Sequence, residues 1–458
     1  MFKVISPVDK QIIIERDYAS SSKIKEVLEQ GAKVKQGWSE STLLEREVIC
    51  TRMLEILQSQ HDELAYEVTM QMGMPITLAK HEITEFIQNS QFMISVAKEA
   101  LQETETYFFG ETTTFIKHEP RGLILIIGAW DHPYLALSGI IIPALMAGNV
   151  VLLNHDEQTA LCAERLIEAG IDAGLPTHVL QYVHTSPEDK LTLVNHEQVN
   201  FVTFSGSVEW GSTIQHAASS RFIGTLMQLA GNDPAYVRAD ADIDHSARQL
   251  VRGTFLNSGQ SRSNVKRLYI AEEILQDFLN AFRHYTYELI LGDPRVTNTD
   301  IGPVLGENQI RTYERKTDDA IKMGAIPLID SSYFPQSTLG AEYIIPQAFV
   351  TVDNTIRVMK NPSEAPIVGI MAVSDEETAI AYMNDSAYGI SASIWTEDET
   401  AAIRIGAQIE TGTFFMNACK IITPTLAWTG VKQSGIGFTL SRMGYQLFTR
   451  PKSFYLKP

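Results

Sequence analysis

The sequence predicts an α/β protein with two doubly wound domains and a small β arm. Between residues 122 and 204, short apolar segments alternate with segments of helical pattern, which is typical of a doubly wound parallel sheet. A second alternating stretch extends from about Pro234 to Gly437. The segment 107–118 is rich in β-branched and aromatic residues, so it predicts a protruding hairpin or arm.

Hydrophobic spacing predicts the individual elements. The first hundred residues are expected to be mostly helical, because apolar residues such as Leu44 and Val48 recur at helical spacing between charged residues. Strands buried on both faces are apolar almost throughout. The predicted strands are 123–127, 150–153, 179–183 and 201–204. The predicted helices between them are 138–147, 159–173 and 188–195.

Residues 134–153 lack charged side chains and are long enough to span a membrane. Pro143 lies inside this stretch, however, and Gly148 with Asn149 breaks it near its end. We therefore predict a strand, a helix and a second strand here, and no membrane span.

Composition limits the possible partners and the compartment. The 458 residues predict two or three domains, and their net charge of −18 argues against binding to nucleic acid or to an anionic membrane. Three cysteines, Cys50, Cys162 and Cys419, are too few for a disulfide framework. The first ten residues lack the apolar core of a signal peptide, so a cytoplasmic protein is expected.

Two β segments have no obvious partner in their own domain. They are 107–118 and the C-terminal 453–456. Exposed strand edges can pair with another chain, which predicts pairing between subunits. The alternative is an ordinary surface hairpin.

A series of short motifs runs along the chain in a fixed order. They are Gly174-Leu-Pro176, His196-Glu197, Phe204-Ser-Gly-Ser-Val-Glu-Trp-Gly211, Leu229-Ala-Gly-Asn-Asp-Pro234, Asn257-Ser-Gly-Gln260, Gly292-Asp-Pro294, Ile301-Gly-Pro303, Asn384-Asp-Ser-Ala-Tyr-Gly389, Trp395-Thr396 and Gly430-Val-Lys-Gln-Ser-Gly435. Their order and spacing resemble the aldehyde dehydrogenase superfamily across essentially the whole chain.

This resemblance implies an aldehyde-dehydrogenase-like fold with three parts. Residues 1–102 and 121–230 would form the cofactor-binding-type, Rossmann-like domain, and 231–437 the catalytic-type α/β domain. Residues 103–120 and 438–458 would form the oligomerisation arm. Members of the family are usually homodimers or tetramers.

The family oxidises aldehydes with NAD(P)+ through a cysteine thiolate, a glutamate base and an asparagine that stabilises the oxyanion. The resemblance places Arg262 at the cysteine position, and shifting by one residue gives Ser261 or Ser263. It places Gln228 at the base position and Asp131 at the oxyanion position. None of these three residues can perform the family role, because arginine stays protonated, an amide is not a base and a carboxylate repels an oxyanion.

The two charge changes, Asp131 and Arg262, look coupled. An isolated buried arginine or aspartate would be very costly, whereas together they could form a bidentate ion pair that fills the pocket. We therefore predict that their charged atoms lie within about 5 Å of each other.

The cofactor site implied by the resemblance is also altered. The Lys-Pro-Ser-Glu run that binds the adenosine ribose reads Asn154-His-Asp-Glu157, which leaves Glu157 but no lysine. The Glu-x-Phe-Gly-Pro run reads Pro362-Ser-Glu-Ala-Pro366, so Pro362 and Glu364 replace the glutamate and the phenylalanine. Trp130, Gly206 and Ser207 are retained, either for the cofactor or as packing, turn and helix-cap residues. Binding of NAD(P) is therefore possible but doubtful.

Three other residues are weaker candidates. Cys419 could be a replacement nucleophile or an ordinary thiol, and His132 could act as an acid or base or pack in its loop. Lys420 could help Arg262 to bind an anion or could reach solvent. The eleven histidines show no ligand spacing, so no metal site is expected.

The sequence leaves several functions open. The first is a homologue that is inactive as a dehydrogenase and is kept as a scaffold, a regulatory subunit or a binder of a small anionic ligand, with an active family partner as one possibility. The second is an NAD(P)-dependent oxidoreductase or a lyase with non-cysteine chemistry. The third is an ordinary dehydrogenase whose motifs are misaligned, although Cys419 is far from Gly259 and Gln260.

Overall fold

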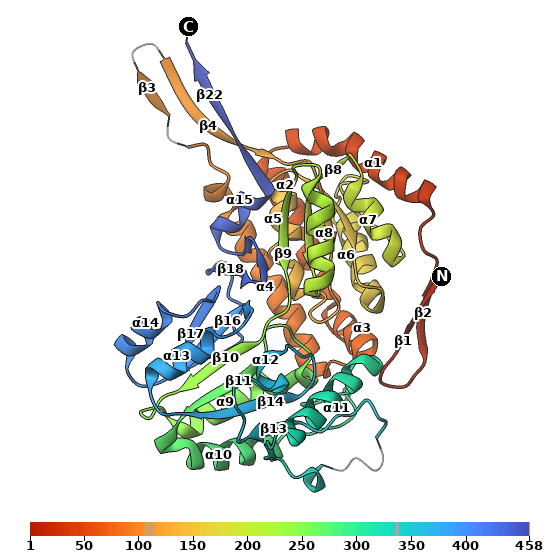
Figure 1. Cartoon of the computed structure of the whole chain (residues 1–458). Helices are drawn as coiled ribbons and strands as arrows, with labels where there is room; N and C mark the ends of the chain where they lie inside the picture. Colours follow the sequence, from red (N-terminus) through yellow and green to blue (C-terminus); the bar gives the residue numbers. More distant parts are fainter. Residues whose placement is uncertain (105, 110–111, 335–338, 458) are drawn as a thin grey trace.

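The computed structural model describes residues 1–457 except 105, 110–111 and 335–338. Two sheets, each covered by helices, form the body of the molecule, and a narrow arm projects from it (Figure 1). The predicted α/β class is confirmed.

The first sheet has six strands in the order β20-β9-β8-β5-β6-β7. Its strands are β5 (Leu123–Ile127), β6 (Val150–Asn154), β7 (Leu180–Tyr182), β8 (Val199–Ser205), β9 (Gly224–Gln228) and β20 (Gly435–Ile436). The central strand β5 is apolar at every position because both of its faces are buried: Ile124 and Ile126 belong to one hydrophobic cluster, and Leu125 and Ile127 to another.

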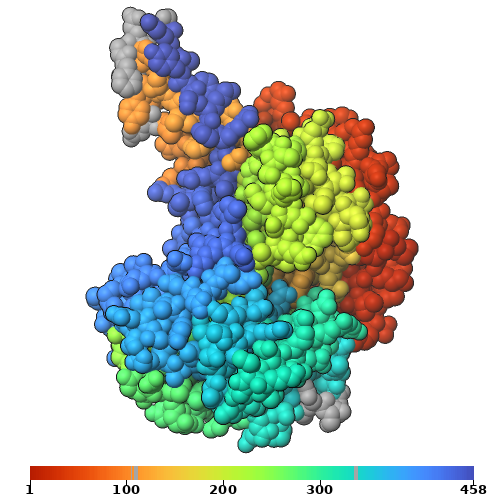
Figure 2. Space-filling view, viewed as in Figure 1, coloured from red at the N-terminus to blue at the C-terminus, as the bar shows by residue number. Residues whose placement is uncertain are grey.

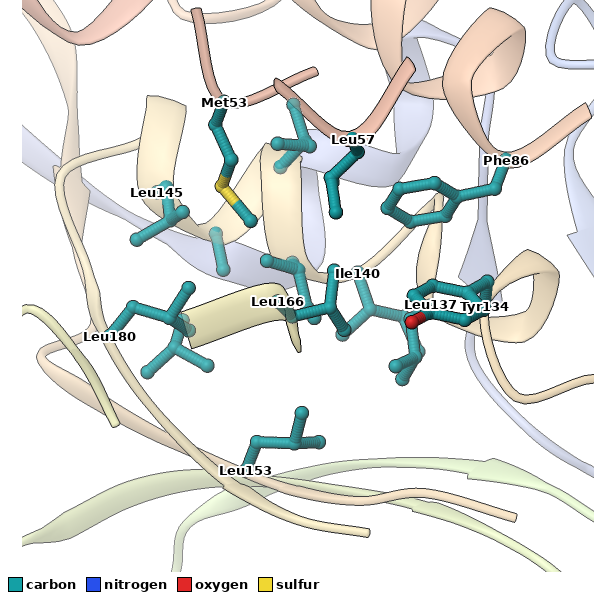
Figure 3. Packing of buried hydrophobic residues seen from close by; sticks show 14 of the residues in the cluster. Met53, Leu57, Phe86, Tyr134, Leu137, Ile140, Leu145, Leu153, Leu166 and Leu180 are labelled. Atoms are coloured by element: carbon teal, nitrogen blue, oxygen red, sulfur yellow. The ribbon is translucent and has the colours of Figure 1, made fainter. Parts of the chain in front are cut away.

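Helices cover both faces of this sheet. They are α1 (Ser21–Glu40), α2 (Leu43–Ser59), α3 (His61–Met72), α4 (Ile76–Ala100), α5 (Ile141–Met146), α6 (Ala160–Asp172), α7 (Pro187–Asn195) and α8 (Val208–Ser219). Figure 3 shows Leu57 of α2 and Phe86 of α4 in the larger cluster. Phe86 packs edge-to-face against Tyr134, with ring centroids 5.7 Å apart, and thereby fixes α4 beside the loop that follows β5.

The local predictions for this domain agree with the structure, with two exceptions. Instead of a helix over 138–147, a 3₁₀ turn (Leu135–Leu137) precedes α5, which begins shortly before Pro143; a proline is tolerated there because the first helical turn needs no N–H donor. The N-terminal hairpin of β1 (Phe2–Ile5) and β2 (Ile12–Arg16) was not expected in a mostly helical segment. Among the described residues, no helix has both the length and the apolar character to cross a membrane.

The second sheet has seven strands in the order β12-β13-β14-β11-β10-β16-β17. Its strands are β10 (Asp233–Val237), β11 (Val265–Ala271), β12 (Ile326–Pro327), β13 (Gln347–Val350), β14 (Ile367–Val373), β16 (Ser391–Trp395) and β17 (Thr413–Met416). Its helices are α9 (Ile243–Phe255), α10 (Leu275–Tyr287), α11 (Gly306–Lys322), α12 (Arg357–Lys360), α13 (Glu376–Asn384) and α14 (Glu399–Gly406). Leu268 and Ile270 of β11 pack into one hydrophobic cluster and Tyr269 into a second, so this sheet is also buried on both faces.

The chain then returns to the first domain. The connecting elements are β15 (Tyr388–Gly389), β18 (Trp428–Thr429), β19 (Val431–Lys432), β21 (Phe438–Thr439) and α15 (Tyr445–Phe448). Strand β20 pairs with β9, and Leu440, Tyr445 and Phe448 lie in the large cluster of the first domain. The returning segment therefore joins the second domain to the first, while the domain limits themselves stay a prediction.

The arm is a three-stranded sheet in the order β22-β4-β3. Strand β4 (Thr112–Pro120) pairs with β22 (Thr449–Leu456) along its whole length and with β3 (Tyr107–Phe109) at its start. The two segments, which show no obvious partner in sequence, pair with each other in the arm in which the resemblance placed both, and Phe115 stacks on Phe454 at 4.7 Å. Figure 2 shows the arm standing away from the body. Residues 105, 110–111 and 458 of the predicted arm lie outside the described residues.

Candidate functional site

Two hollows meet where the domains face each other. We call the smaller one, of about 60 Å3, the inner cavity, and Asp131, Gln228 and Arg262 all line it. The larger one, of about 470 Å3, is called the cleft. Ser261 and Arg262 line both hollows and so form the boundary between them. The structure thus brings together the three positions that the sequence singled out for chemistry.

The loop that carries Ser261 and Arg262 is held in an unusual backbone conformation. Asn257, Ser258 and Gly259 have φ angles of 54°, 56° and 70°, in the left-handed region. At Gly259 a side chain could not fit, because a Cβ atom would lie 2.4 Å from the carbonyl oxygen of Ala365. The buried Lys266 Nζ donates to the carbonyl oxygens of Gly259 (3.2 Å) and Ala365 (2.8 Å). The side chain of Lys266, which lies on β11, therefore holds the loop in place.

Asp131 and Arg262 form the predicted ion pair. Arg262 Nε donates to Asp131 Oδ2 at 3.0 Å, and the Asp131 side chain is only 2% exposed. The contact is not the bidentate fork we expected, because Arg262 Nη1 donates instead to the main-chain oxygen of Gln228 at 2.8 Å. Burial by itself would raise the pKa of Asp131, but the charges of Arg262 and His132 and the hydrogen bonds from Arg262 outweigh it and lower that pKa.

Gln228 is the last residue of β9 and is held by hydrogen bonds. Its Oε1 accepts from the hydroxyl of Ser205 at 2.9 Å, and its Nε2 donates to Thr439 Oγ1 at 3.3 Å. The side chain therefore bridges β8 and the returning C-terminal segment. An amide in this setting orients its neighbours and supplies no base.

A second polar series reaches the inner cavity from α4. His132 Nδ1 lies 2.9 Å from Glu82 Oε2, and His132 Nε2 lies 3.2 Å from Ser261 Oγ. Glu82 is 3% exposed, and its other oxygen accepts from the main-chain N–H of Tyr134 at 3.1 Å. The sequence left open whether His132 acts as an acid or base or packs in its loop. In the structure its ring lies between the buried carboxylate of Glu82 and the hydroxyl of Ser261.

Sequence reasoning missed Glu82. The available signal was its position on the buried face of α4: Ala79, Ile83 and Phe86 are buried on the same face. A glutamate among such residues must find a partner, because an unpaired buried carboxylate is costly.

The other candidates are placed less favourably for catalysis. Cys419 Sγ lies 3.8 Å from the main-chain oxygen of Gln249, and burial raises the pKa of this thiol to about 12. Lys420 does not extend freely into solvent; it is half-buried, and burial lowers its pKa to about 8. Neither residue lines the inner cavity.

Of the predicted cofactor residues, Trp130, Gly206 and Ser207 line the cleft. Ser207 caps α8, since its hydroxyl accepts from the N–H of Trp210 at 3.2 Å. At Gly206 a Cβ atom would lie 2.5 Å from the ring of Phe204, so this glycine is needed for close packing. These residues place the start of α8 at the wall of the cleft, and the first turn of a helix is a place where backbone N–H groups can hold an anion.

Asn154 and Glu157 do not line the cleft. The Asn154 amide donates to the main-chain oxygen of Val183 at 2.8 Å and to Thr185 Oγ1 at 3.1 Å. Glu157 accepts from the hydroxyl of Tyr18 at 3.0 Å. Both side chains are thus engaged in contacts within the first domain.

The cleft carries mixed charge. Lys190 lines it, as do Pro362 and Glu364. Burial, together with the nearby charge of Asp131, raises the pKa of Glu364 to about 7. Among the described residues, no group of three or more histidine, cysteine, aspartate or glutamate side chains is arranged to hold a metal ion.

Two helix-covered sheets with a cleft at their junction and a projecting β arm define the class of protein. The chain belongs to the aldehyde dehydrogenase family, whose model matches residues 1–454. It is 28% identical over 457 residues to betaine aldehyde dehydrogenase 2 of Rhizobium meliloti (strain 1021), covering 99% of this chain and 93% of that relative.

Two further comparisons agree. The chain is 30% identical over 411 residues to an aldehyde dehydrogenase of Paenarthrobacter nicotinovorans, covering 88% of each. The crystal structure of NADP-dependent glyceraldehyde-3-phosphate dehydrogenase from Bacillus halodurans C-125, complexed with NADP, matches with a TM-score of 0.93 at 25% identity, covering 100% of this chain and 95% of that one. The aldehyde-dehydrogenase-like fold predicted from the motifs is confirmed.

Proposed function

We propose that this chain does not oxidise aldehydes through a cysteine and is kept for what it binds, as a ligand-binding, scaffold or regulatory homologue. The observation that carries this proposal is the buried Asp131–Arg262 ion pair, 3.0 Å long, at the boundary of the two hollows. A fixed guanidinium there is no nucleophile, and a paired carboxylate offers nothing to an oxyanion.

The positions of the three cysteines support this proposal. Cys50 and Cys162 are buried in the hydrophobic cluster of the first domain. Burial raises the pKa of Cys50 to about 12 and that of Cys162 well above the ordinary value of 9.0. Cys419 is likewise protonated at neutral pH. Burial therefore disfavours, at all three cysteines, the thiolate that thiol chemistry requires.

The cleft fits only part of a dinucleotide. The start of α8 and Lys190 suit a phosphate group. The ribose positions do not fit, because Asn154 and Glu157 bond within the first domain and Pro362 offers no side-chain acceptor. We derive no hydride transfer from this site, and we infer that a small phosphate-bearing or carboxylate-bearing anion suits the cleft better than NAD(P).

The proposal is tested by adding dinucleotide and aldehydes to the purified protein. We expect no NAD(P)H formation from a panel of aliphatic and semialdehyde substrates, and less than 1 °C of change in melting temperature at millimolar NAD+ or NADP+. A ligand present at a hundred times its dissociation constant would add about 2.7 kcal/mol to the free energy of unfolding, which a melting curve shows easily.

The controls separate the alternatives. The relative from Rhizobium meliloti is assayed in parallel as the positive control. Turnover that iodoacetamide abolishes would contradict the proposal, whereas turnover that resists iodoacetamide would favour an oxidoreductase with non-cysteine chemistry. Dinucleotide binding without turnover would contradict the inference that the cleft fits only part of a dinucleotide. It would leave standing the proposal that the chain does not oxidise aldehydes.

We also propose that the arm assembles two or four copies of the chain. Strand β22 is an edge strand, and at its end Tyr455 and Leu456 are 72% and 50% exposed. Replacing both by lysine should convert the oligomer to a monomer, because charged side chains discourage pairing at a strand edge. Light scattering after size exclusion measures the mass. Leu44→Lys with Val48→Lys, a pair of exposed residues on α2, is the matched control and should leave the mass unchanged.

A further inference from the structure

Glu82, His132 and Ser261 form a continuous hydrogen-bonded series that ends in the inner cavity. The two distances, 2.9 Å from Glu82 Oε2 to His132 Nδ1 and 3.2 Å from His132 Nε2 to Ser261 Oγ, lie within the range found for an orienting carboxylate, a base and a nucleophile. In the tautomer that carries its proton on Nδ1, His132 donates to Glu82 and accepts from Ser261. The same roles recur in serine hydrolases of unrelated folds.

The carboxylate end of the series is rigid. Glu82 lies on α4, which is fixed by Phe86 and its neighbours in the large hydrophobic cluster. Glu82 Oε1 accepts from the N–H of Tyr134, so Oε2 remains for His132. A buried, hydrogen-bonded carboxylate of this kind orients an imidazole and stabilises its protonated form.

The hydroxyl end is buried, with Ser261 2% exposed, and it borders both hollows. His132 and Ser261 line the inner cavity, and Ser261 also lines the cleft. The inner cavity, of about 60 Å3, has room for a short acyl group, and the cleft, of about 470 Å3, has room for a larger leaving group. We propose that Ser261 is the nucleophile, His132 the general base and Glu82 the positioning residue of a serine acyl-transfer site that takes short-chain esters or thioesters.

The reaction balances with water as the second substrate. Ser261 Oγ bonds to the carbonyl carbon while its proton moves to His132 Nε2. The tetrahedral intermediate then breaks the bond to the leaving oxygen or sulfur, which takes the proton from Nε2, and the acyl group remains on Ser261. Water attacks this acyl group and gives a proton to Nε2; the bond from the acyl carbon to Oγ then breaks, Oγ takes the proton back from Nε2, and the carboxylic acid leaves.

Arg262 offers one N–H donor to the oxyanion. Its Nε and Nη1 are used by Asp131 and by the main-chain oxygen of Gln228. Its Nη2 has no hydrogen-bond partner among the described residues, and the side chain lines the inner cavity beside Ser261. A fixed cation next to the nucleophile stabilises the developing negative charge.

This inference goes beyond the proposed function and shares with it only the absence of thiol chemistry. Ester hydrolysis needs no dinucleotide, so the two proposals can fail separately. A purely structural network would give the same distances but no acylation, which makes acylation the measurement that distinguishes the two.

The experiment uses the full-length protein and p-nitrophenyl acetate. We expect a burst of p-nitrophenol equal to about one per chain, and peptide mass mapping of the quenched protein should find the acetyl group on Ser261. Ser261→Ala should abolish the burst, and His132→Gln should lower the acylation rate by about 10²–10⁴-fold. Glu82→Gln should lower the rate while leaving the acetyl group on Ser261.

The matched control is His81→Gln. His81 is the residue before Glu82 on α4 and pairs with Glu85 on the surface, at 3.3 Å, outside the inner cavity. The His81→Gln variant should be acylated on Ser261 at the wild-type rate. An acetyl group found only on lysines, or a burst unchanged in Ser261→Ala, would overturn the proposal. The mapping on the wild-type chain needs no variant, so the test stands even where a substitution impairs folding.

Discussion

Replacing Arg262 by methionine is expected to lower the free energy of unfolding by about 3–5 kcal/mol, measured from urea denaturation. The reason is the carboxylate that remains. Asp131 is 2% exposed and would keep its charge in the protein without a cation at 3.0 Å. Methionine fills much of the space of the arginine stem, so the loss of packing contributes little.

A double variant isolates the ion pair. Asp131→Leu combined with Arg262→Met should recover most of the loss, because an apolar pair can replace a buried ion pair at little cost. The exposed pair Arg295–Asp293, with side chains 42% and 37% exposed, is the matched control, and Arg295→Met should change stability by less than about 1 kcal/mol. Equal effects at the two sites would contradict the account given for Arg262.

The same variant should show a pH signature. The pKa of Asp131 is lowered from 3.8 in the folded protein, so its contribution to stability is present above the unfolded pKa and is lost as the pH falls through the folded pKa. In Arg262→Met, protonation of Asp131 removes the unpaired charge. The difference in stability between wild type and variant should therefore shrink between pH 7 and pH 4, and a difference that stays constant with pH would exclude Asp131 as its cause.

Replacing Arg267 by methionine is expected to destabilise the second domain by about 3 kcal/mol, because it leaves the buried main-chain oxygens of Asn232 and Met383 without a donor, whereas that of Tyr382 still accepts from the hydroxyl of Tyr269 at 3.2 Å. Arg267 is 1% exposed and donates to the main-chain oxygens of Asn232 (2.9 Å), Tyr382 (2.9 Å) and Met383 (3.1 Å). It thus ties β11 to the start of β10 and to α13.

The measurement is again the urea transition, followed by hydrogen exchange resolved along the chain. We expect the loss of protection to concentrate in β10, β11 and α13. Arg248→Met provides the comparison, since Arg248 is 57% exposed on α9. A uniform loss of protection over both domains would show that the arginine supports more than its own sheet.

The fold was predictable where a local pattern carries the information. The runs at 123–127 and 150–153 are apolar throughout and the run at 201–204 is interrupted only by Thr203, a pattern typical of a strand buried on both faces. The pairing of β4 with β22 was not predictable in this way. Their residues are more than 300 positions apart, and hydrogen bonds between backbones leave no trace in side-chain type.

The site shows the same division. The Asp131–Arg262 pair was predictable because two costly charges at one site require each other. The contact between Glu82 and His132 spans 50 residues and depends on how α4 packs against the loop after β5. Asn154 and Glu157 stand where the resemblance places ribose-binding residues. In the structure they bond instead to Val183 and Tyr18 of their own domain, and the sequence alone does not reveal these contacts.

The ion pair also restricts which single substitutions this chain can accept at Asp131 and Arg262. A chain that exchanged Arg262 for cysteine first would retain the buried charge of Asp131, and one that exchanged Asp131 for asparagine first would retain an uncompensated guanidinium. Both single variants are expected to be less stable than the chain that keeps the pair. The stability effects of substitutions at the two positions are therefore coupled, and a change at one position costs less stability when the other position changes with it.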